Sequence, residues 1–196
     1  QMNTMKNERT TWFVVDIECN GPVPALYDMV SIGAVVMTRG AGGQLNIGET
    51  FYIEIQPQAP RFDARAAAIH GLDQDKLKIE GIPRREAMIE LSDWVHSQTK
   101  PGTSPTFVAH NAPFDWSFIS WTYVAEELDN PFGYKALCTK SMSAGVLNLH
   151  WLDTNKENLS ERLKLPAEDM SLKHRADYDA QYQALILKSL LELQEG

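Results

Sequence analysis

WFVVDIEC (residues 12–19) joins four apolar residues to two acidic ones. Its first four residues are aromatic or β-branched, which is typical of a central strand that is buried on both faces. Alternate side chains of a strand leave the same face, so Asp16 and Glu18 share one face while Val15 and Ile17 point into the core. Two carboxylates side by side repel each other unless a cation lies near them. A solvated strand end is the ordinary alternative, but the preceding apolar run favours a site at a sheet edge.

A further acidic residue follows the next short apolar strand. In HNAPFD (residues 110–115) strand gives way to helix, and Asp115 falls in the first helical turn. An acidic residue there is also favoured by capping and by the helix macrodipole, so this position alone does not define a site. His110 and Asn111 precede the turn, where they can contact a substrate or cap the helix.

The third acidic segment is HRADYDA (residues 174–180), which holds His174 and Asp179 five positions apart. On one continuous helix these side chains would point about 140° apart. They can face one cavity only if His174 precedes the helix and Asp179 lies one turn inside it. Asp177 competes for this role, and we favour Asp179 because alanines on both sides of it indicate close packing.

Together these residues predict a cation-dependent chemistry. Hard oxygen ligands select magnesium or manganese, and an imidazole can take a proton near neutral pH. We therefore interpret the chain as a metal-dependent enzyme that acts on a phosphate ester. The five candidate catalytic residues are Asp16, Glu18, Asp115, His174 and Asp179.

Composition narrows the alternatives. With 196 residues, 43% of them hydrophobic, the chain can bury a full core, and we expect one domain over residues 11–196 after a flexible segment at 1–10. The chain contains no apolar run of about 18 residues, which argues against a membrane span.

Cys19 and Cys138 fit neither a disulfide framework nor a zinc site, so a reduced, cytoplasmic setting is expected. The net charge of −8 argues against extensive duplex binding but permits gripping a short single-stranded end.

Turn residues and apolar periodicity place the other elements. The glycine-rich turn at 39–43 predicts that its flanking strands pair antiparallel. Predicted strands cover 12–17, 29–38, 46–56, 106–109 and 134–138. Predicted helices cover 62–70, 83–98, segments beginning at 113 and 139, a segment around 158, and 176–194. An antiparallel start followed by alternating strands and helices predicts an α/β domain with a mixed sheet.

Two groups of side chains could contact nucleic acid or serve an ordinary structural role. The aromatic residues of the helix after HNAPFD could stack on bases, although their helical spacing is also typical of a core. Lys173 and Arg175 flank His174 and could meet a phosphate. Cys19 follows Glu18, but neighbouring carboxylates disfavour the thiolate that a nucleophile needs.

The three acidic segments, taken jointly and in this order, resemble the signature of the DEDDh 3′→5′ exonucleases. DIE matches the first motif, HNAPFD the second, and the H-x₄-D of HRADYDA the third; IHGLDQDKL (69–77) is similar to the family's intervening segment. The resemblance spans residues 16–179. It implies an RNase H-like fold, with a five-stranded mixed sheet flanked by helices on both faces. It also implies hydrolysis at the 3′ end of single-stranded RNA or DNA, with release of nucleoside 5′-monophosphates.

The resemblance assigns a role to each site residue. It implies two Mg²⁺ or Mn²⁺ ions, with Asp16 touching both, Glu18 and Asp179 completing the first site, and Asp115 serving the second. His174 would deprotonate the attacking water. The resemblance also implies substrate contacts, for which the candidate residues are Cys19, Asn20, His110 and Asn111.

The sequence and its resemblance leave three functions open. The first is a stand-alone exonuclease similar in scale to ribonuclease T and oligoribonuclease, whose likeness suggests a homodimer. The second is a proofreading subunit bound to a polymerase, and the third is a non-catalytic nucleic-acid-binding module of the same fold. CNGPVPALYD (19–28) replaces the family's commoner threonine-glycine turn, and Gln183 stands where a small or hydroxyl residue is frequent, which leaves the choice between RNA and DNA open.

Overall fold

The computed structural model describes residues 9–195. Most of the segment predicted to be flexible, residues 1–10, lies outside the described residues, and Thr10 already belongs to the first strand. Among the helices of the described part, none is long and apolar enough to cross a membrane.

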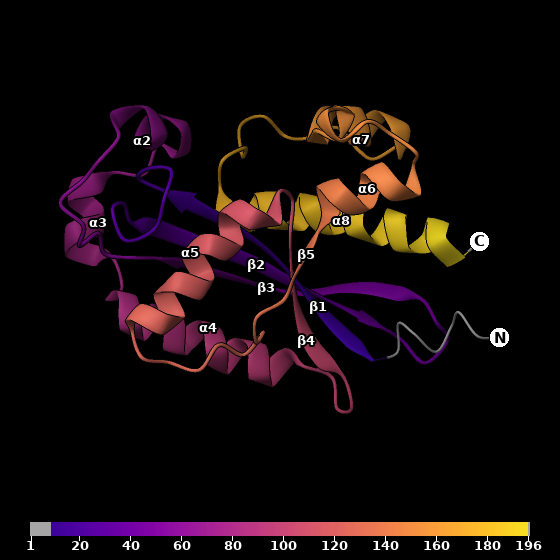
Figure 1. Cartoon of the computed structure of the whole chain (residues 1–196), viewed down its shortest axis with the longest axis horizontal. Coiled ribbons are helices and arrows are strands. Elements are labelled where there is room, and N and C mark those ends of the chain that lie inside the picture. Colours follow the sequence, from indigo (N-terminus) through magenta and orange to yellow (C-terminus); the bar gives the residue numbers. More distant parts are fainter. Residues whose placement is uncertain (1–8, 196) are drawn as a thin grey trace.

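Five strands form one mixed sheet in the order β3-β2-β1-β4-β5 (Figure 1). The pairs β1–β2 and β2–β3 are antiparallel, whereas β1–β4 and β4–β5 are parallel. The predicted mixed sheet and the predicted antiparallel start are therefore confirmed. The strands are β1 Thr10–Cys19, β2 Met29–Arg39, β3 Leu45–Glu54, β4 Ser104–Ala109 and β5 Ala136–Cys138.

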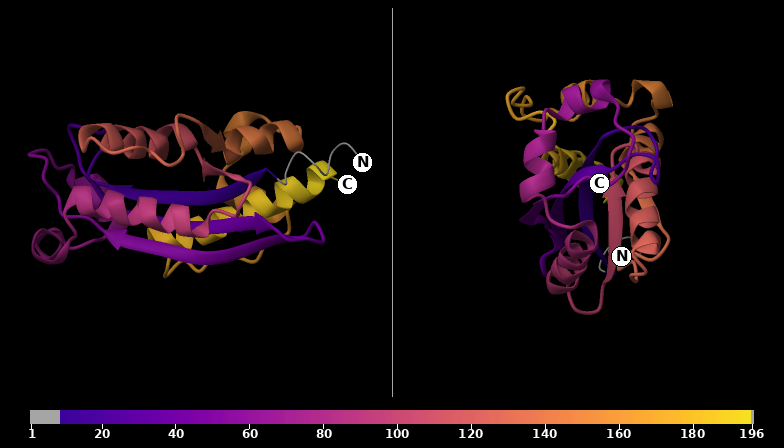
Figure 2. Two further views of the ribbon diagram at one scale, coloured as in Figure 1. Left: turned by 90° about the horizontal axis from the view of Figure 1, so that it is seen from below. Right: turned by 90° about the vertical axis from the view of Figure 1, so that its left-hand side faces the viewer.

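Helices cover both faces of this sheet (Figures 1 and 2). On one face α4 and α5 pack against β1, and on the other face α8 packs against β1 and β2. The helices are α2 Ala64–His70, α3 Gln74–Glu80, α4 Arg84–Gln98, α5 Ala112–Ala125, α6 Thr139–Val146, the 3₁₀ helix η1 Trp151–Asp153, α7 Lys156–Arg162 and α8 Ala176–Glu195. The two short helices α3 and η1 were not predicted, and β5 is shorter than predicted.

The centre of the sheet explains why β1 carries the apolar run. Phe13 and Val15 are fully buried toward α4 and α5, and Val14 is fully buried toward α8. Each face of β1 therefore lies in a separate part of the core, and the strand can place polar groups only where it emerges at its end.

Gly33 determines how closely α8 approaches this end of the sheet. It pairs with Asp16 across the β1–β2 ladder. A Cβ at Gly33 would clash with the backbone of Ala176 and Asp177, so a side chain here would push away the start of α8. This glycine lets the first turn of α8 lie directly beside Asp16.

Candidate active site

The strand end of β1 presents the first two acidic groups as predicted. Asp16 and Glu18 are both half-buried and leave the same face of β1. Pairing of β1 with β2 shifts register between Glu18 and Cys19, so the ladder is irregular directly after the acidic pair. Asp16 Oδ1 accepts a hydrogen bond from Gln183 Nε2 at 2.6 Å, which ties this carboxylate to α8.

Asp115 reaches the same place from α5. It lies in the first turn of the helix and only 5% of its surface is exposed. The backbone turns from β4 into α5 through Asn111, which has a left-handed φ of 70° that asparagine tolerates. Asp115 Oδ1 then accepts a hydrogen bond from the Ile17 backbone N–H at 3.2 Å, so the carboxylate is fixed to the backbone between the two acidic residues of β1.

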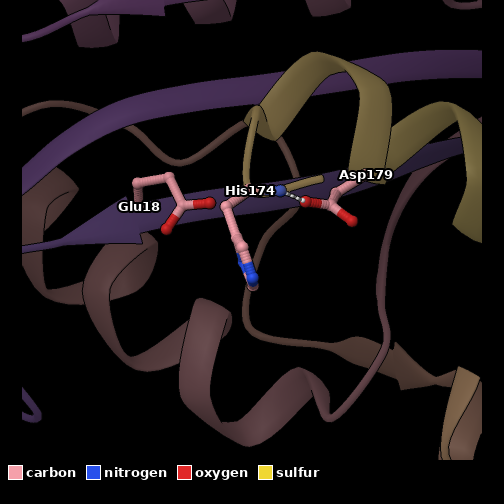
Figure 3. A group of neighbouring side chains, drawn as sticks. All are labelled: Glu18, His174 and Asp179. Atoms are coloured by element: carbon pink, nitrogen blue, oxygen red, sulfur yellow. Dashed lines mark hydrogen bonds between the residues drawn. The ribbon is translucent and has the colours of Figure 1, made fainter. Parts of the chain in front are cut away.

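His174 and Asp179 come together at the start of α8. The helix begins at Ala176, so His174 precedes it and Asp179 lies one turn inside, as the spacing argument required. The His174 N–H donates to Asp179 Oδ2 at 2.8 Å. Ligand atoms of Glu18, His174 and Asp179 all lie within 4.8 Å of one another, and Figure 3 shows His174 between the two carboxylates.

Asp177, the competing carboxylate, has a different environment. Arg175 Nη2 donates to Asp177 Oδ2 at 2.9 Å, which forms an ion pair at the surface. Asp179, by contrast, is only 3% exposed and belongs to the acidic cluster. Of the two carboxylates, Asp179 is therefore the one that the structure brings to the candidate site.

The cluster is electrostatically unfavourable without a cation. Burial raises the pKa of Asp16 to about 7, against the opposing effect of the Lys156 ammonium. Burial, followed by the nearby carboxylates beginning with Asp16, raises the pKa of Glu18 to about 9. Burial and Asp16 also raise the pKa of Asp115 well above its usual range. These shifts are what crowded, dehydrated carboxylates show, and a cation at their centre would reverse them.

One cation already lies inside the cluster, and no sequence motif had indicated it. Lys156 Nζ, at the start of α7, donates to Asp179 Oδ1 at 2.7 Å, and the lysine side chain is 18% exposed. Burial alone would lower the pKa of Lys156, but Asp16 and Asp179 outweigh burial and raise it. Lys156 is therefore a charged, half-buried partner of the acidic residues.

Gln183 is the second site residue whose role the sequence did not reveal. Its Nε2 bonds Asp16, and its Oε1 accepts a hydrogen bond from the His110 backbone N–H at 3.1 Å. One buried side chain of α8 therefore joins the ends of β1 and β4. The departure from the usual residue at position 183 has a structural explanation, because a small side chain would leave both partners without this bond.

The four predicted substrate residues lie around the cluster in different environments. Cys19 is buried, and burial followed by the charge of Asp115 raises the pKa of its thiol, which opposes nucleophilic chemistry. Asn111 is exposed. The His110 ring bonds Thr139 Oγ1 through Nδ1 at 2.9 Å, and burial lowers the pKa of His110 to about 4, so the ring is neutral.

Asn20 is buried, and its side chain is already engaged. It donates to Gln74 Oε1 at 2.7 Å, and its Oδ1 lies 3.1 Å from His70 Nε2. These bonds connect the loop after β1 to the segment 69–77, which explains why IHGLDQDKL accompanies the first acidic motif. The Asn20 side chain holds the loop in place, and its role in substrate binding stays a prediction.

The aromatic residues of α5 serve mainly the core. Phe118 and Tyr123 are fully buried, and Trp116 packs against Phe107 with ring centroids 5.0 Å apart. Trp121 lies under the guanidinium of Arg84 at 5.2 Å. The core interpretation therefore holds for Trp116, Phe118 and Tyr123, whereas Trp121 packs against Arg84 outside the core.

Two hollows flank the acidic cluster. We call the first the terminal hollow; it has a volume of about 590 Å³ and its lining includes Glu18, Cys19, Gly21, Ile69 and Phe114. We call the second the lysine hollow; it has a volume of about 340 Å³ and its lining includes His110, Asn111, Lys140, Trp151, Lys156 and Lys173. In Figure 1, α2 lies on one side of this edge of the molecule, and α6 and α7 lie on the other.

Sequence comparison finds relatives along nearly the whole chain. Residues 11–191 match the family described as the 3′-5′ exoribonuclease Rv2179c-like domain. The protein named 3′-5′ DNA exonuclease Cap18 of Escherichia coli is 34% identical over 191 residues, which cover 97% of each chain. Ribonuclease T of Marinobacter nauticus is 28% identical over 174 residues, which cover 86% of this chain and 76% of that protein.

Structural comparison agrees with the fold. The nuclease domain of 3′hExo, described as a DEDDh family member bound to rAMP, superimposes with a TM-score of 0.76 over 97% of this chain and 94% of that chain. Its sequence identity is 14%, so this likeness concerns the fold. The expected five-stranded, RNase H-like α/β fold is confirmed.

Proposed function

The chain belongs to the family of 3′-5′ exoribonuclease Rv2179c-like domains and is a 3′-5′ exonuclease, and we propose that it removes nucleoside 5′-monophosphates from single-stranded 3′ ends at the acidic cluster. The convergence of Glu18, His174 and Asp179 within 4.8 Å, beside Asp16, is the observation that supports this site. Two segments distant in sequence, 16–18 and 174–179, supply these groups, and Asp115 joins them from a third segment.

The donor set fits divalent ions. The Lys156 ammonium pairs with Asp179 and acts electrostatically on Asp16, Glu18 and Asp115, and the raised pKa values of Asp16 and Glu18 indicate a pocket that is short of positive charge. Asp16, Glu18 and Asp179 would hold one Mg²⁺ or Mn²⁺, and Asp16 with Asp115 would hold a second. Bound there, the two ions would supply Lewis acidity to the phosphate and stabilise charge on the leaving 3′ oxygen.

His174 is the general base in this proposal. Its side chain is exposed, and its backbone has a left-handed φ of 67° that lifts the residue out of the helical path. Asp179 fixes the His174 backbone through the N–H but leaves the ring free to receive the proton of the attacking water. The ring is therefore placed by the turn and not by side-chain hydrogen bonds to the cluster.

The terminal hollow would hold the 3′-terminal nucleoside. Glu18 lines this hollow, and the exposed side chains of Ile69 and Phe114 give it an apolar surface. Flat apolar surface suits a base in a sequence-tolerant way. The names of the relatives include both a DNA exonuclease and a ribonuclease, so RNA and DNA oligomers of the same sequence should both be assayed.

Labelled oligomers test this function directly. With Mg²⁺ or Mn²⁺, a 5′-labelled single strand should shorten one residue at a time, and a 3′-labelled strand should release its label as a mononucleotide. Asp16→Asn should lower the rate by about 1,000-fold or more, because it removes the carboxylate proposed to serve both ions. Asp177→Asn is the matched control and should stay within about twofold. Internal cleavage, loss from the 5′ end, or full activity of Asp16→Asn would each contradict the proposal.

The homodimer and the polymerase-bound alternative stay predictions. Sedimentation of the purified protein would test the first, and a pull-down with a replicative polymerase would test the second. A non-catalytic binding module would bind the labelled oligomers without shortening them.

A further inference from the structure

We propose that the lysine hollow binds the single strand on the 5′ side of the cleaved bond, with Trp151 stacking on a base and Lys140 contacting a phosphate. This inference rests on the proposed function and adds to it a second subsite. The hollow is built from α6, η1, α7 and the segment before α8, outside the three acidic segments.

The aromatic ring and the ammonium already lie together there. Trp151 is 45% exposed, so part of its ring surface is accessible to a ligand. Lys140 Nζ lies 4.6 Å from the centroid of the Trp151 ring. Stacked bases and backbone phosphates need this pair of groups, an exposed π-face beside a cation.

The charged residues that line the lysine hollow are mostly basic. The chain carries a net charge of −8, yet Lys140, Lys156 and Lys173 line this hollow with one acidic residue, Glu157. Lys156 is engaged by Asp179, and Lys173 by Glu157 at 3.1 Å. Among the described residues Lys140 forms no ion pair, so its charge is available to a phosphate.

Position determines which part of a strand this hollow can receive. Glu18, a member of the acidic cluster, lines the terminal hollow. Lys156, which donates a hydrogen bond to Asp179 of the cluster, lines the lysine hollow. The scissile phosphate must lie at the acidic groups between them. If the last nucleoside lies in the terminal hollow, the chain on the other side of the phosphate has to leave across the cluster. The lysine hollow, lined by Lys156, lies on that side of the cluster.

A length series separates this subsite from the chemistry. The variants Trp151→Ala and Lys140→Gln are compared with the unmodified protein on oligomers of two to ten nucleotides and on the p-nitrophenyl ester of thymidine 5′-monophosphate. The ester has no nucleotide on the 5′ side of its scissile phosphate, so it lacks both the base and the backbone phosphate that the lysine hollow is proposed to bind. Tyr134→Ala is the matched control, because Tyr134 is 86% exposed and has the Lys135 Nζ 5.8 Å from its ring centroid, but it precedes β5 and does not line either hollow.

We expect Trp151→Ala to raise KM for the ten-residue oligomer about tenfold, as loss of one stacked base does, with kcat within about twofold. Its KM for the ester should be unchanged. Lys140→Gln should reduce the slope of log binding constant against log salt by about 0.7, the value for one phosphate contact on a single strand. An unchanged oligomer KM in Trp151→Ala would overturn the subsite, and so would a tenfold rise that Tyr134→Ala shares.

The proposed function can fail independently of this inference. If the unmodified protein hydrolyses neither the oligomers nor the ester, the exonuclease assignment of the site is wrong. Binding of a fluorescent ten-residue oligomer, measured by anisotropy with calcium in place of magnesium, still tests the subsite. Binding that is weakened by Trp151→Ala relative to Tyr134→Ala supports it, and equal binding by both variants overturns it.

Discussion

The acidic cluster is supported from two sides that are built differently. On the side of β1 and α5, the support comes from the backbone: Asp16 and Glu18 extend from the part of β1 that pairs with β2, and Asp115 accepts a hydrogen bond from the Ile17 N–H. On the side of α7 and α8, the supports are side chains and a turn. Asp179 is held there by Lys156 and by the His174 N–H.

This difference separates rigidity from adaptability. Asp115 is bonded to the backbone of a strand in the sheet, whereas the Lys156 side chain and the turn at His174 can change position without unfolding an element. The first side therefore suits fixed ligands of an ion. The side of α7 and α8 suits His174, which would accept a proton, and Lys156, which would move aside when an ion binds.

Lys156→Met should have the largest effect, because it leaves Asp179 buried without its cation. We expect the free energy of unfolding to fall by about 3 kcal/mol in chelator, which corresponds to about 6–12 °C in Tm. Magnesium should restore part of this loss, since a bound ion replaces the missing charge. Thermal and urea unfolding with and without magnesium measure both effects.

Lys188→Met is the control for that experiment. Lys188 pairs with Glu192 at 4.0 Å on the exposed face of α8, and its loss should cost under about 0.5 kcal/mol. If Lys188→Met and Lys156→Met destabilise the protein equally, the two sides of the cluster do not differ in the way described.

His174→Asn tests the proton-transfer group. Asparagine tolerates the left-handed backbone, so the turn should persist while the base is lost. We expect kcat to fall about 100-fold, which is about 2.7 kcal/mol, with little change in the affinity for magnesium or in Tm. Steady-state kinetics and calorimetric titration with the ion measure these quantities. Arg175→Ala, next in the chain, should keep kcat within about twofold, and an unchanged kcat in His174→Asn removes this residue from the mechanism.

Gln183→Leu tests the bridge between the two sides. It removes the bonds to Asp16 and to the His110 N–H, and the buried groups left unpaired should cost about 2 kcal/mol of unfolding free energy. Gln181→Leu makes the same change two positions earlier on the exposed face of α8 and should be nearly neutral. Urea unfolding of the two variants decides the point; equal stability would show that the bridge contributes nothing.

The pH dependence of ion binding is the smallest expected effect. Glu18 and Asp16 have pKa values raised to about 9 and about 7, so the folded, ion-free protein holds protons that the unfolded chain has lost. Raising the pH from 6 to 9 should therefore lower the stability of the ion-free protein. A divalent ion binds the ionised carboxylates, so its affinity should rise with pH, by at most about tenfold (about 1.4 kcal/mol) per pH unit for one proton released.

Calorimetric titration with magnesium at pH 6, 7 and 8 measures this dependence. Glu18→Gln, which removes the most strongly shifted group, should flatten it. A magnesium affinity that does not change with pH in the unmodified protein would show that the carboxylates are already ionised before the ion arrives.

Much of the fold could be predicted because local signals were strong. The apolar runs and the glycine turn placed β1, β2 and β3 within two residues of their observed ends, and Pro83 marked the start of α4. α3 and η1 were missed because α3 (QDKLKIE) has only two apolar residues and η1 has only three residues, too few to show a period, whereas the equally short α2 was indicated by its alanines. The alanine neighbours of Asp179 indicated close packing, and Asp179 is 3% exposed and lies near Glu18 and His174; its role in the site stays a prediction.

The sequence by itself determined which residues are acidic, on which face of a strand or turn of a helix they lie, and that they occur in the order of one nuclease family. Those are local properties, set by the period of the strand and helix and by the motif spacing. Only the tertiary structure showed that Gly33 lets α8 approach Asp16, that Lys156 balances the buried charge, and that Trp151 and Lys140 face the same hollow. These are contacts between segments far apart in the chain, and their energies depend on distance and burial, which no local pattern encodes.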